Sequence, residues 1–233
     1  MHSATYTQRR GELETYFDRT AAAAWARLTS DAPLGTIRAT VRAGRDSMRA
    51  TLLDWLPADL RGRRVLDAGA GTGALAVEAA RRGARVTAID LSQTLVDLAR
   101  TRLPRDLGEG HVEFLMGDML DPALGRFDHI VCMDSLIHYR TPDMVRAVAG
   151  LAARAERSVL FTFAPRTPLL ATMHTVGRLF PRGDRAPAIE PVGASSLNRH
   201  LAKDAGLMDW QAARSRRVSK GFYISQALEV LRK

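Results

Sequence analysis

The chain has 233 residues and a mass of 25.5 kDa, which is enough for one large domain or for one domain with a small appendage. Hydrophobic residues make up 46% and charged residues 25%, which excludes a disordered chain or a collagen-like fibre. Cys132 is the only cysteine, so an intrachain disulfide and the cysteine clusters of zinc and iron–sulfur sites are excluded. No apolar run approaches the roughly 20 residues that span a bilayer, and the N-terminus is polar. A cytoplasmic protein is expected.

The chain is strongly basic, with a net charge of +9 and a sequence pI of about 10.6. Of the 34 basic residues, all but Lys203, Lys220 and Lys233 are arginine. A coding sequence rich in G and C produces such a composition without any function. The alternative is an anionic partner, which could be a nucleic acid, an acidic membrane surface or a carboxylate substrate.

The first 60 residues have helical periodicity and are predicted to form a helical lid. Two apolar stripes occur at helix spacing, separated by Asp31-Ala32-Pro33. Four arginines lie beside the second stripe and form either a solvated helix face or a clamp over an anionic ligand. The first stripe is Leu13, Phe17, Ala21, Ala24 and Leu28; the second is Ile37, Val41, Met48 and Leu52; the arginines are Arg38, Arg42, Arg45 and Arg49.

Residues 61–165 alternate short β-rich runs with helical stretches, which predicts a parallel sheet covered on both faces. The runs are Arg64–Leu66, Arg85–Ile89, Val112–Met116, His129–Met133 and Ser158–Phe163, and the helical stretches include Gln93–Leu103 and Asp143–Arg154. Beyond an irregular stretch at about 165–193, Ser195–Ala205 reads as a helix. Trp210–Ser219 and Phe222–Leu231 read as an antiparallel hairpin that closes the edge of the sheet. We therefore divide the chain into a lid at 1–60 and an α/β domain at 61–233.

A glycine-rich turn follows the first predicted strand. Asp67, Gly69, Gly71 and Gly73 give the pattern D-x-G-x-G-x-G, in which bare backbone can approach a ligand. The same run satisfies the looser dinucleotide pattern G-x-G-x-x-G/A, so a nicotinamide or flavin cofactor has to be weighed. Asp90 ends the second strand, where a carboxylate can accept hydrogen bonds from both ribose hydroxyls.

Three features separate these alternatives. They are the early acid Asp67, the Gly117-Asp118 pair after the third strand, and the lack of a second nucleotide-binding half. Together they resemble the class I S-adenosylmethionine-dependent methyltransferases over about residues 63–165. The resemblance implies a Rossmann-like fold with a seven-stranded, mostly parallel sheet and an antiparallel last strand. It also implies S-adenosylmethionine as cofactor, contacted by Asp67, Gly69, Ala70, Gly71, Asp90, Leu91, Asp118, Met119 and Met133.

A narrower resemblance covers nearly the whole chain. It is carried by Thr15–Thr20, Trp25, the arginine row, Asp134–Tyr139, Phe161–Pro165 and Pro168–Arg185. These segments resemble the magnesium-protoporphyrin IX O-methyltransferases of bacteriochlorophyll synthesis, which esterify one propionate of the porphyrin. By this resemblance Tyr16 and His138 match the pair implicated in catalysis. Relatives often carry Cys where this chain has Ala70, and we expect little effect because backbone makes the contact there.

The implied reaction joins a carboxylate, ionised near pH 7, to a sulfonium cation, so charge disappears in the transition state. We therefore expect His138 and Tyr16 to align the propionate rather than to remove a proton. No protein-bound metal is expected, because the magnesium belongs to the substrate. Candidate walls for the porphyrin are Phe17, Trp25, Leu169, Met173, Leu179 and Phe180, and further arginines for a propionate or membrane are Arg166, Arg178, Arg182 and Arg185.

Other functions remain open at this point. The acceptor could be a quinone, a small carboxylate or tRNA, although no RNA-binding module accompanies the domain. A non-catalytic partner of a magnesium chelatase would keep the cofactor site without an acceptor. The resemblance also suggests contact with the chelatase and peripheral association with the inner or photosynthetic membrane.

Overall fold

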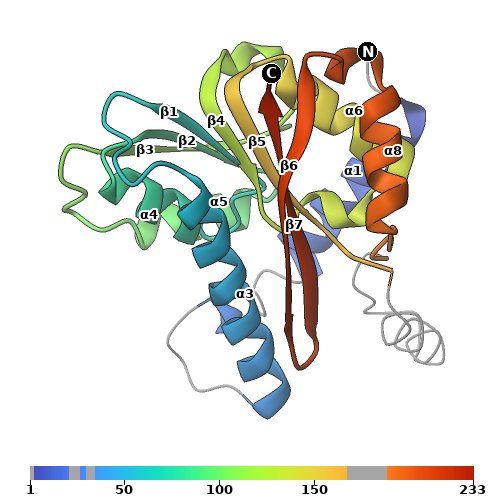
Figure 1. Cartoon of the computed structure of the whole chain (residues 1–233). Coiled ribbons are helices and arrows are strands. Elements are labelled where there is room, and N and C mark those ends of the chain that lie inside the picture. Colours follow the sequence, from blue (N-terminus) through green and yellow to red (C-terminus); the bar gives the residue numbers. More distant parts are fainter. Residues whose placement is uncertain (1–2, 21–26, 30–34, 167–187) are drawn as a thin grey trace.

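The computed structural model describes residues 3–20, 27–29, 35–166 and 188–233. Several predicted substrate residues lie outside these ranges. They are Trp25, Leu169, Met173, Arg178, Leu179, Phe180, Arg182 and Arg185. The described residues form one seven-stranded sheet with helices on both faces (Figure 1).

The sheet has the strand order β3-β2-β1-β4-β5-β7-β6. The first five strands are parallel, while β7 pairs antiparallel with both β5 and β6. The predicted parallel sheet and its closing hairpin are therefore confirmed. The strands are β1 (Arg64–Ala68), β2 (Arg85–Asp90), β3 (His111–Met116), β4 (Phe127–Cys132), β5 (Ala155–Phe163), β6 (Trp210–Lys220) and β7 (Tyr223–Arg232).

Helices cover both faces because the central strands are apolar on both sides. One hydrophobic core holds side chains of α1, α6 and α8, and the other holds side chains of α3, α4 and α5. The helices are α1 (Ala4–Thr15), a π-helix (Tyr16–Thr20), α3 (Thr36–Trp55), α4 (Ala74–Arg81), α5 (Gln93–Thr101), α6 (Thr141–Ala152) and α8 (Ala194–Lys203), with 3-10 turns at Pro122–Leu124, Leu136–His138 and Ala205–Leu207.

The helix expected to reach Ala205 ends two residues earlier, at Lys203. Asp204 is the reason, because its backbone is extended and its side chain accepts a hydrogen bond from the Gly206 N–H at 2.9 Å. The acid thereby caps the following 3-10 turn instead of continuing the helix. Sequence periodicity located the helix but not this competing cap.

Helix α3 is anchored in the core next to the C-terminal hairpin. Met48 and Leu52 are fully buried, and they share a core with Val131 and Leu160 of the sheet. Gly44 is required where the helix crosses β7, because a Cβ there would lie 2.5 Å from Cδ1 of Tyr223. Among the residues that the structure describes, no helix has the length and apolarity to cross a lipid bilayer.

Candidate functional site

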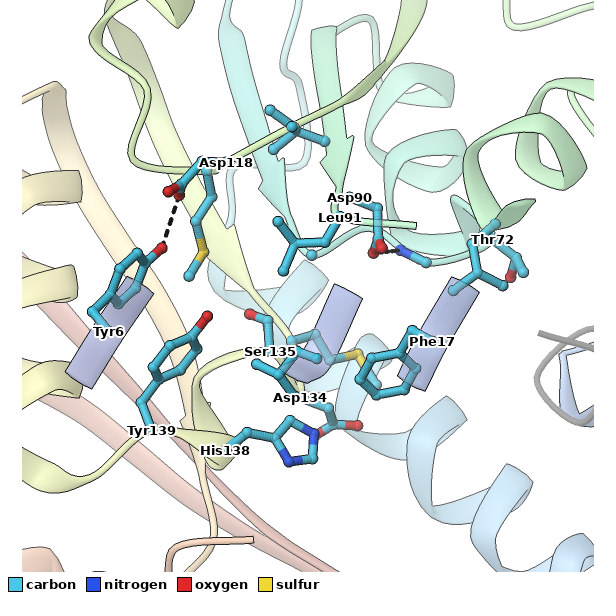
Figure 2. A pocket seen from close by; sticks show the side chains of 18 of the residues that line it. Tyr6, Phe17, Thr72, Asp90, Leu91, Asp118, Asp134, Ser135, His138 and Tyr139 are labelled. Carbon is cyan, nitrogen blue, oxygen red and sulfur yellow. Dashed lines mark hydrogen bonds between the residues drawn. The ribbon is translucent and has the colours of Figure 1, made fainter. Parts of the chain in front are cut away.

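A cavity opens at the carboxyl ends of β1, β2 and β4, the edge where open α/β sheets bind ligands (Figure 2). Its walls are mostly apolar, with polar groups at a few places. The lining includes Tyr6, Leu13, Phe17, Arg45, Gly69, Gly71, Thr72, Asp90, Leu91, Asp118, Met119, Met133, Asp134, Ser135, His138 and Tyr139. Most of the predicted cofactor residues therefore lie together at this edge.

The glycine loop connects β1 to α4 and borders the cavity. Gly69, Gly71 and Gly73 all have positive φ, at 81°, 55° and 78°. A Cβ on Gly69 would lie 2.4 Å from Cβ of Ser135, and one on Gly73 would lie 2.6 Å from the Phe114 ring. Nothing lies within 4 Å of the corresponding position at Gly71. Two of the glycines thus permit close packing, and Gly71 leaves open space for a ligand.

Asp90 ties the glycine loop to the end of β2. Its Oδ2 accepts a hydrogen bond from the Gly71 N–H at 2.7 Å, and its Oδ1 accepts one from the Ser92 N–H at 3.0 Å (Figure 2). Burial raises the pKa of the carboxyl group, while these backbone donors favour its ionised form. The carboxylate is therefore held in place beside Leu91, where the predicted ribose contact requires it.

Asp67 is a buried acid without a full set of partners. Its side chain is 1% exposed, and its Oδ2 has no hydrogen-bond partner among the described residues. Burial, with Asp90 as a second cause, raises its pKa to about 7. Asp67 lines a second cavity, which it shares with Gly69, Ala70 and Gly71. An unsatisfied acid beside an open glycine loop fits the cationic amino group of S-adenosylmethionine.

Asp118 lies at the other end of the first cavity, where helix α1 covers it. Its Oδ1 accepts hydrogen bonds from the Tyr6 hydroxyl at 2.8 Å and the Leu120 N–H at 2.9 Å (Figure 2). Arg10 Nη1 donates to Oδ2 at 3.0 Å. The Tyr6 ring stacks on Tyr139, with ring centroids 4.9 Å apart. This predicted cofactor residue is thus tied to the N-terminal helix, a connection the sequence did not reveal.

His138 and Tyr16 occupy different positions relative to the cavity. His138 lines it and is 7% exposed, with Nδ1 3.4 Å from the Ala188 carbonyl oxygen. Its ring meets the edge of Phe17 at a centroid distance of 5.9 Å. Tyr16 is half-buried and packs against Phe17 at 5.2 Å, but it is not among the cavity-lining residues that the structure describes. Phe17 therefore contacts both predicted catalytic side chains.

Asp134 forms a polar network that sequence reasoning missed. It follows β4 with a φ of 56°, the only positive φ outside glycine among the described residues. Its carboxylate pairs with Arg45 Nη1 at 2.7 Å and accepts a hydrogen bond from the Tyr223 hydroxyl at 3.0 Å. Thr162 Oγ1 accepts a hydrogen bond from the Asp134 N–H at 2.7 Å. The network joins α3, β5 and β7 to the end of β4 at the wall of the cavity.

The sequence left two interpretations of the arginine row of α3, a solvated helix face and a clamp over an anionic ligand. The structure assigns different arginines to different interpretations. Arg38 is exposed, as on a solvated face. Arg42, Arg45 and Arg49 line the second cavity. Arg42 donates to the carbonyl oxygens of Leu28 and Arg27, and Arg49 pairs with Asp46 at 2.8 Å. Most of the row therefore faces the cavity, because the apolar stripe beside it packs on the sheet.

Comparisons with known proteins show which family the chain resembles. A family model described as the magnesium-protoporphyrin IX methyltransferase C-terminus matches residues 132–232, and a methyltransferase-domain model matches residues 65–157. The magnesium-protoporphyrin O-methyltransferase of Rhodobacter capsulatus is 49% identical over 96% of this chain and 97% of its own. The Synechocystis enzyme of the same name is 31% identical over 94% and 95%.

A solved structure extends the likeness to three dimensions. The crystal structure of magnesium protoporphyrin IX methyltransferase from Synechocystis PCC 6803, with bound S-adenosylhomocysteine, has a TM-score of 0.84. It is 28% identical in sequence and covers 96% of this chain and 100% of its own. The fold is therefore that of a class I methyltransferase, and the chain belongs to the family of magnesium-protoporphyrin O-methyltransferases.

Proposed function

We propose that this protein transfers the methyl group of S-adenosylmethionine to a propionate carboxylate of magnesium-protoporphyrin IX, giving the monomethyl ester in (bacterio)chlorophyll synthesis. The observation that carries the proposal is the 49% identity with the Rhodobacter capsulatus enzyme, which extends over 96% of this chain. A shared class I fold alone would not select the acceptor, because one fold hosts many activities.

The cofactor residues have distinct proposed tasks. S-adenosylmethionine supplies an electrophilic methyl group on a sulfonium sulfur. Asp90 orients the glycine loop and accepts hydrogen bonds from the ribose, and Gly71 leaves room for the ligand beside its backbone. Asp67 would pair with the amino group of the methionine part, because its Oδ2 lacks a partner. Asp118 would accept from the adenine amino group with Leu91, Met119 and Met133 as apolar walls.

His138 is proposed to position the acceptor rather than to act as a base. The propionate is already ionised near neutral pH, so no proton has to be removed. His138 lies at the carboxyl end of β4 with its ring against Phe17, where a nitrogen can donate a hydrogen bond to the carboxylate. Alignment of oxygen, methyl carbon and sulfur then supplies most of the acceleration. Tyr16 would act through Phe17, or on the acceptor once it is bound.

We infer that the Asp134 carboxylate prevents Arg45 from binding the reacting carboxylate too strongly. An anion and a cation neutralise each other in this reaction, so an uncompensated positive charge would stabilise the ground state more than the transition state. The Asp134 carboxylate lies 2.7 Å from the Arg45 guanidinium and balances its charge inside the cavity. The pair can still orient the acceptor by hydrogen bonds while presenting little net charge.

The N-terminal helices are proposed to cover the bound cofactor and acceptor. Helix α1 reaches the adenine end through Asp118, and α3 borders the methionine end with its arginines. Residues 1–60 would form this cover and 61–233 the methyltransferase domain. Handover of the porphyrin from a magnesium chelatase stays a prediction from the family resemblance.

A turnover assay tests the proposal. The full chain is incubated with S-adenosylmethionine and either magnesium-protoporphyrin IX or metal-free protoporphyrin, and esters are identified by chromatography and mass. We expect the monomethyl ester from the magnesium form. No ester from either porphyrin, with cofactor binding intact, would refute the acceptor and direct the search to quinones, small acids and tRNA.

A second measurement tests the role of His138. We expect His138→Ala to lower kcat strongly, with His138→Asn recovering part of the rate, because an amide can still donate a hydrogen bond. His200→Asn, at an exposed histidine on α8, is the matched control and should leave the rate unchanged. Complete loss in both His138 variants, with both substrates still binding, would contradict a positioning role.

A further inference from the structure

The π-helix Tyr16–Thr20, which continues helix α1, reaches two parts of the molecule at once. π-Helical turns are rare and are frequent at functional sites. Phe17 lines the first cavity, where its ring meets His138 (Figure 2). The next residue, Asp18, contacts the N-terminal end of α5 instead. Two neighbouring residues therefore connect the cavity wall that includes His138 with helix α5.

The Asp18 carboxylate acts as an additional cap on α5. Its Oδ1 accepts hydrogen bonds from the Thr94 N–H at 3.0 Å and from the Ser92 hydroxyl at 3.1 Å. The Thr94 N–H lies in the first turn of the helix, where no acceptor within the helix is available. The partial positive charge of a helix N-terminus further favours an anion there. Asp18 thereby holds the π-helix on α5.

Ser92 connects Asp18 with Asp90, the acid of the proposed ribose contact. Its N–H donates to Asp90 Oδ1 at 3.0 Å, and its hydroxyl donates to Asp18. The same hydroxyl oxygen accepts a hydrogen bond from the Leu95 N–H at 3.2 Å, and the residue is fully buried. Asp90 in turn accepts a hydrogen bond from the Gly71 N–H at 2.7 Å. A continuous series of hydrogen bonds therefore runs from the glycine loop to the π-helix.

Helix α5 does not need Asp18 in order to form. It has its own N-cap in Ser92, and it buries an apolar face of its own. Helix α1, by contrast, buries only Tyr6 and Leu13 among its residues. The contact made by Asp18 therefore matters more for the placement of Phe17 than for the stability of α5.

We propose that Asp18 is a positioning residue that couples the cofactor site to the acceptor site. Ribose hydroxyls that bind Asp90 restrict the first turn of α5 through Ser92. Asp18 transmits this restriction to Phe17, so the wall beside His138 is more firmly ordered when the cofactor is bound. Such coupling is reciprocal, because each ligand raises the affinity for the other by the same factor. The identity of the acceptor rests on the proposed function, whereas the link from Asp90 to Phe17 does not.

Hydrogen exchange of the full chain, with and without S-adenosylhomocysteine, tests the link in the absence of any acceptor. In the wild type we expect this ligand to slow exchange in residues 69–73 and in residues 16–20. In Asp18→Ala it should still protect residues 69–73 but no longer residues 16–20. Asp18→Asn should restore the protection, because its amide oxygen can accept both hydrogen bonds. Equal protection of residues 16–20 in the wild type and in Asp18→Ala would overturn the proposal.

Binding of magnesium-protoporphyrin IX with and without S-adenosylhomocysteine measures the coupling itself. We expect the wild type to bind the porphyrin roughly tenfold more tightly when S-adenosylhomocysteine is present. This ratio should approach one in Asp18→Ala and return in Asp18→Asn. Asp97→Ala, which removes an exposed carboxylate from α5 outside both cavities, is the matched control and should keep the wild-type ratio. A wild-type ratio in Asp18→Ala, or equal losses in Asp18→Ala and Asp97→Ala, would contradict the coupling.

Two outcomes separate this proposal from the proposed function. If neither porphyrin is bound or methylated while Asp18→Ala loses the protection of residues 16–20, the link stands and the acceptor assignment fails. If magnesium-protoporphyrin IX is methylated and Asp18→Ala keeps the wild-type ratio, the function stands and the coupling fails. Faster exchange throughout α5 in Asp18→Ala would show a purely structural cap and would also overturn the coupling.

Discussion

Helices α1 and α3 both precede the sheet in the chain, yet they are held by different forces. Helix α3 buries apolar side chains in its C-terminal half, with Met48 and Leu52 fully inside a core shared with the sheet. Helix α1 buries only Tyr6 and Leu13 among its residues. Its remaining attachments are polar, from Ser3 and Thr5 to Asp143 and from Tyr6 to Asp118.

Because of this difference, we expect the two helices to differ in how easily they can detach from the domain. Apolar burial contributes roughly 25 cal/mol per Å² and is lost only when the core opens. Hydrogen bonds to a carboxylate contribute about 1.5–3 kcal/mol each and can be exchanged for bonds to water or to a ligand. We therefore expect α3 to act as a fixed wall of the site, and α1 to act as a cover that can open without unfolding the domain.

The largest effect on stability is expected for a substitution in α3, the helix that forms the wall of the site. Leu52→Ala in α3 should lower the free energy of unfolding by about 3–5 kcal/mol, because a fully buried side chain leaves a cavity. Leu13→Ala removes the same atoms from α1 and should cost less than half as much, since α1 can open locally. Denaturant unfolding followed by circular dichroism measures both. Equal losses would mean that α1 is as firmly integrated as α3.

The two acids at the ends of the site, Asp118 and Asp67, differ in their hydrogen-bond partners. Asp118, under α1, accepts hydrogen bonds from Tyr6, Arg10 and the Leu120 N–H, whereas Asp67 Oδ2 has no partner among the described residues and the pKa of Asp67 is raised to about 7. Between pH 4 and 7 the folded state then binds more protons at Asp67 than the unfolded state, so ionisation of Asp67 lowers stability as pH rises.

Asp67→Asn should remove this contribution to the pH dependence. The ligand-free variant should be more stable than wild type at pH 8 by on the order of 2–4 kcal/mol, with little difference at pH 4. Its affinity for S-adenosylmethionine should fall. Thermal unfolding across pH checks the first expectation and calorimetric titration the second. A stability difference that does not change with pH would show that Asp67 is already neutralised or paired.

Asp134→Asn tests the charge balance where α3 meets the site. Asparagine tolerates a positive φ almost as well as aspartate does, so the backbone should be kept. The uncompensated Arg45 would bind the acceptor carboxylate more strongly, so kcat and the acceptor KM should both fall, kcat by roughly tenfold.

The matched control is Asp97→Asn, which unpairs Arg100 at an exposed position on α5, outside both cavities. It should change neither constant by more than about twofold, because exposed ion pairs contribute little. A rise in the acceptor KM of Asp134→Asn would instead indicate that the network is only structural.

The smallest effect is expected at the cover. Tyr6→Phe removes the hydroxyl donor to Asp118, and burial keeps the pKa of Tyr6 well above its ordinary value, so the hydroxyl is protonated throughout the working pH range. Loss of this bond should raise the KM for S-adenosylmethionine by about three- to tenfold. Hydrogen exchange should accelerate in α1 and stay unchanged in α3. Acceleration in both helices would contradict an independently opening cover.

Much of the fold was predictable because local signals were strong and mutually consistent. Alternating β-rich runs and helical stretches predicted the parallel sheet, and the Lys220-Gly221 turn predicted the closing hairpin. The glycine pattern and Asp90 predicted the cofactor edge, since backbone conformation and position at a strand end follow from residue type. The helix end at Lys203 was not predicted. The apolar periodicity continues beyond this residue, but Asp204 caps the following 3-10 turn and ends the helix.

The sequence by itself determined the mostly parallel sheet, the edge of the sheet at which the cofactor site lies, and the place of His138 after the fourth strand. Each of these depends on patterns within a few tens of residues. Only the tertiary structure decided which arginine meets Asp134, that Tyr6 covers Asp118, and that Phe17 contacts His138. These pairs join residues from 89 to more than 100 positions apart, or depend on a helix's rotation about its axis. Their geometry is set by how α1 and α3 pack on the sheet, which no local pattern encodes.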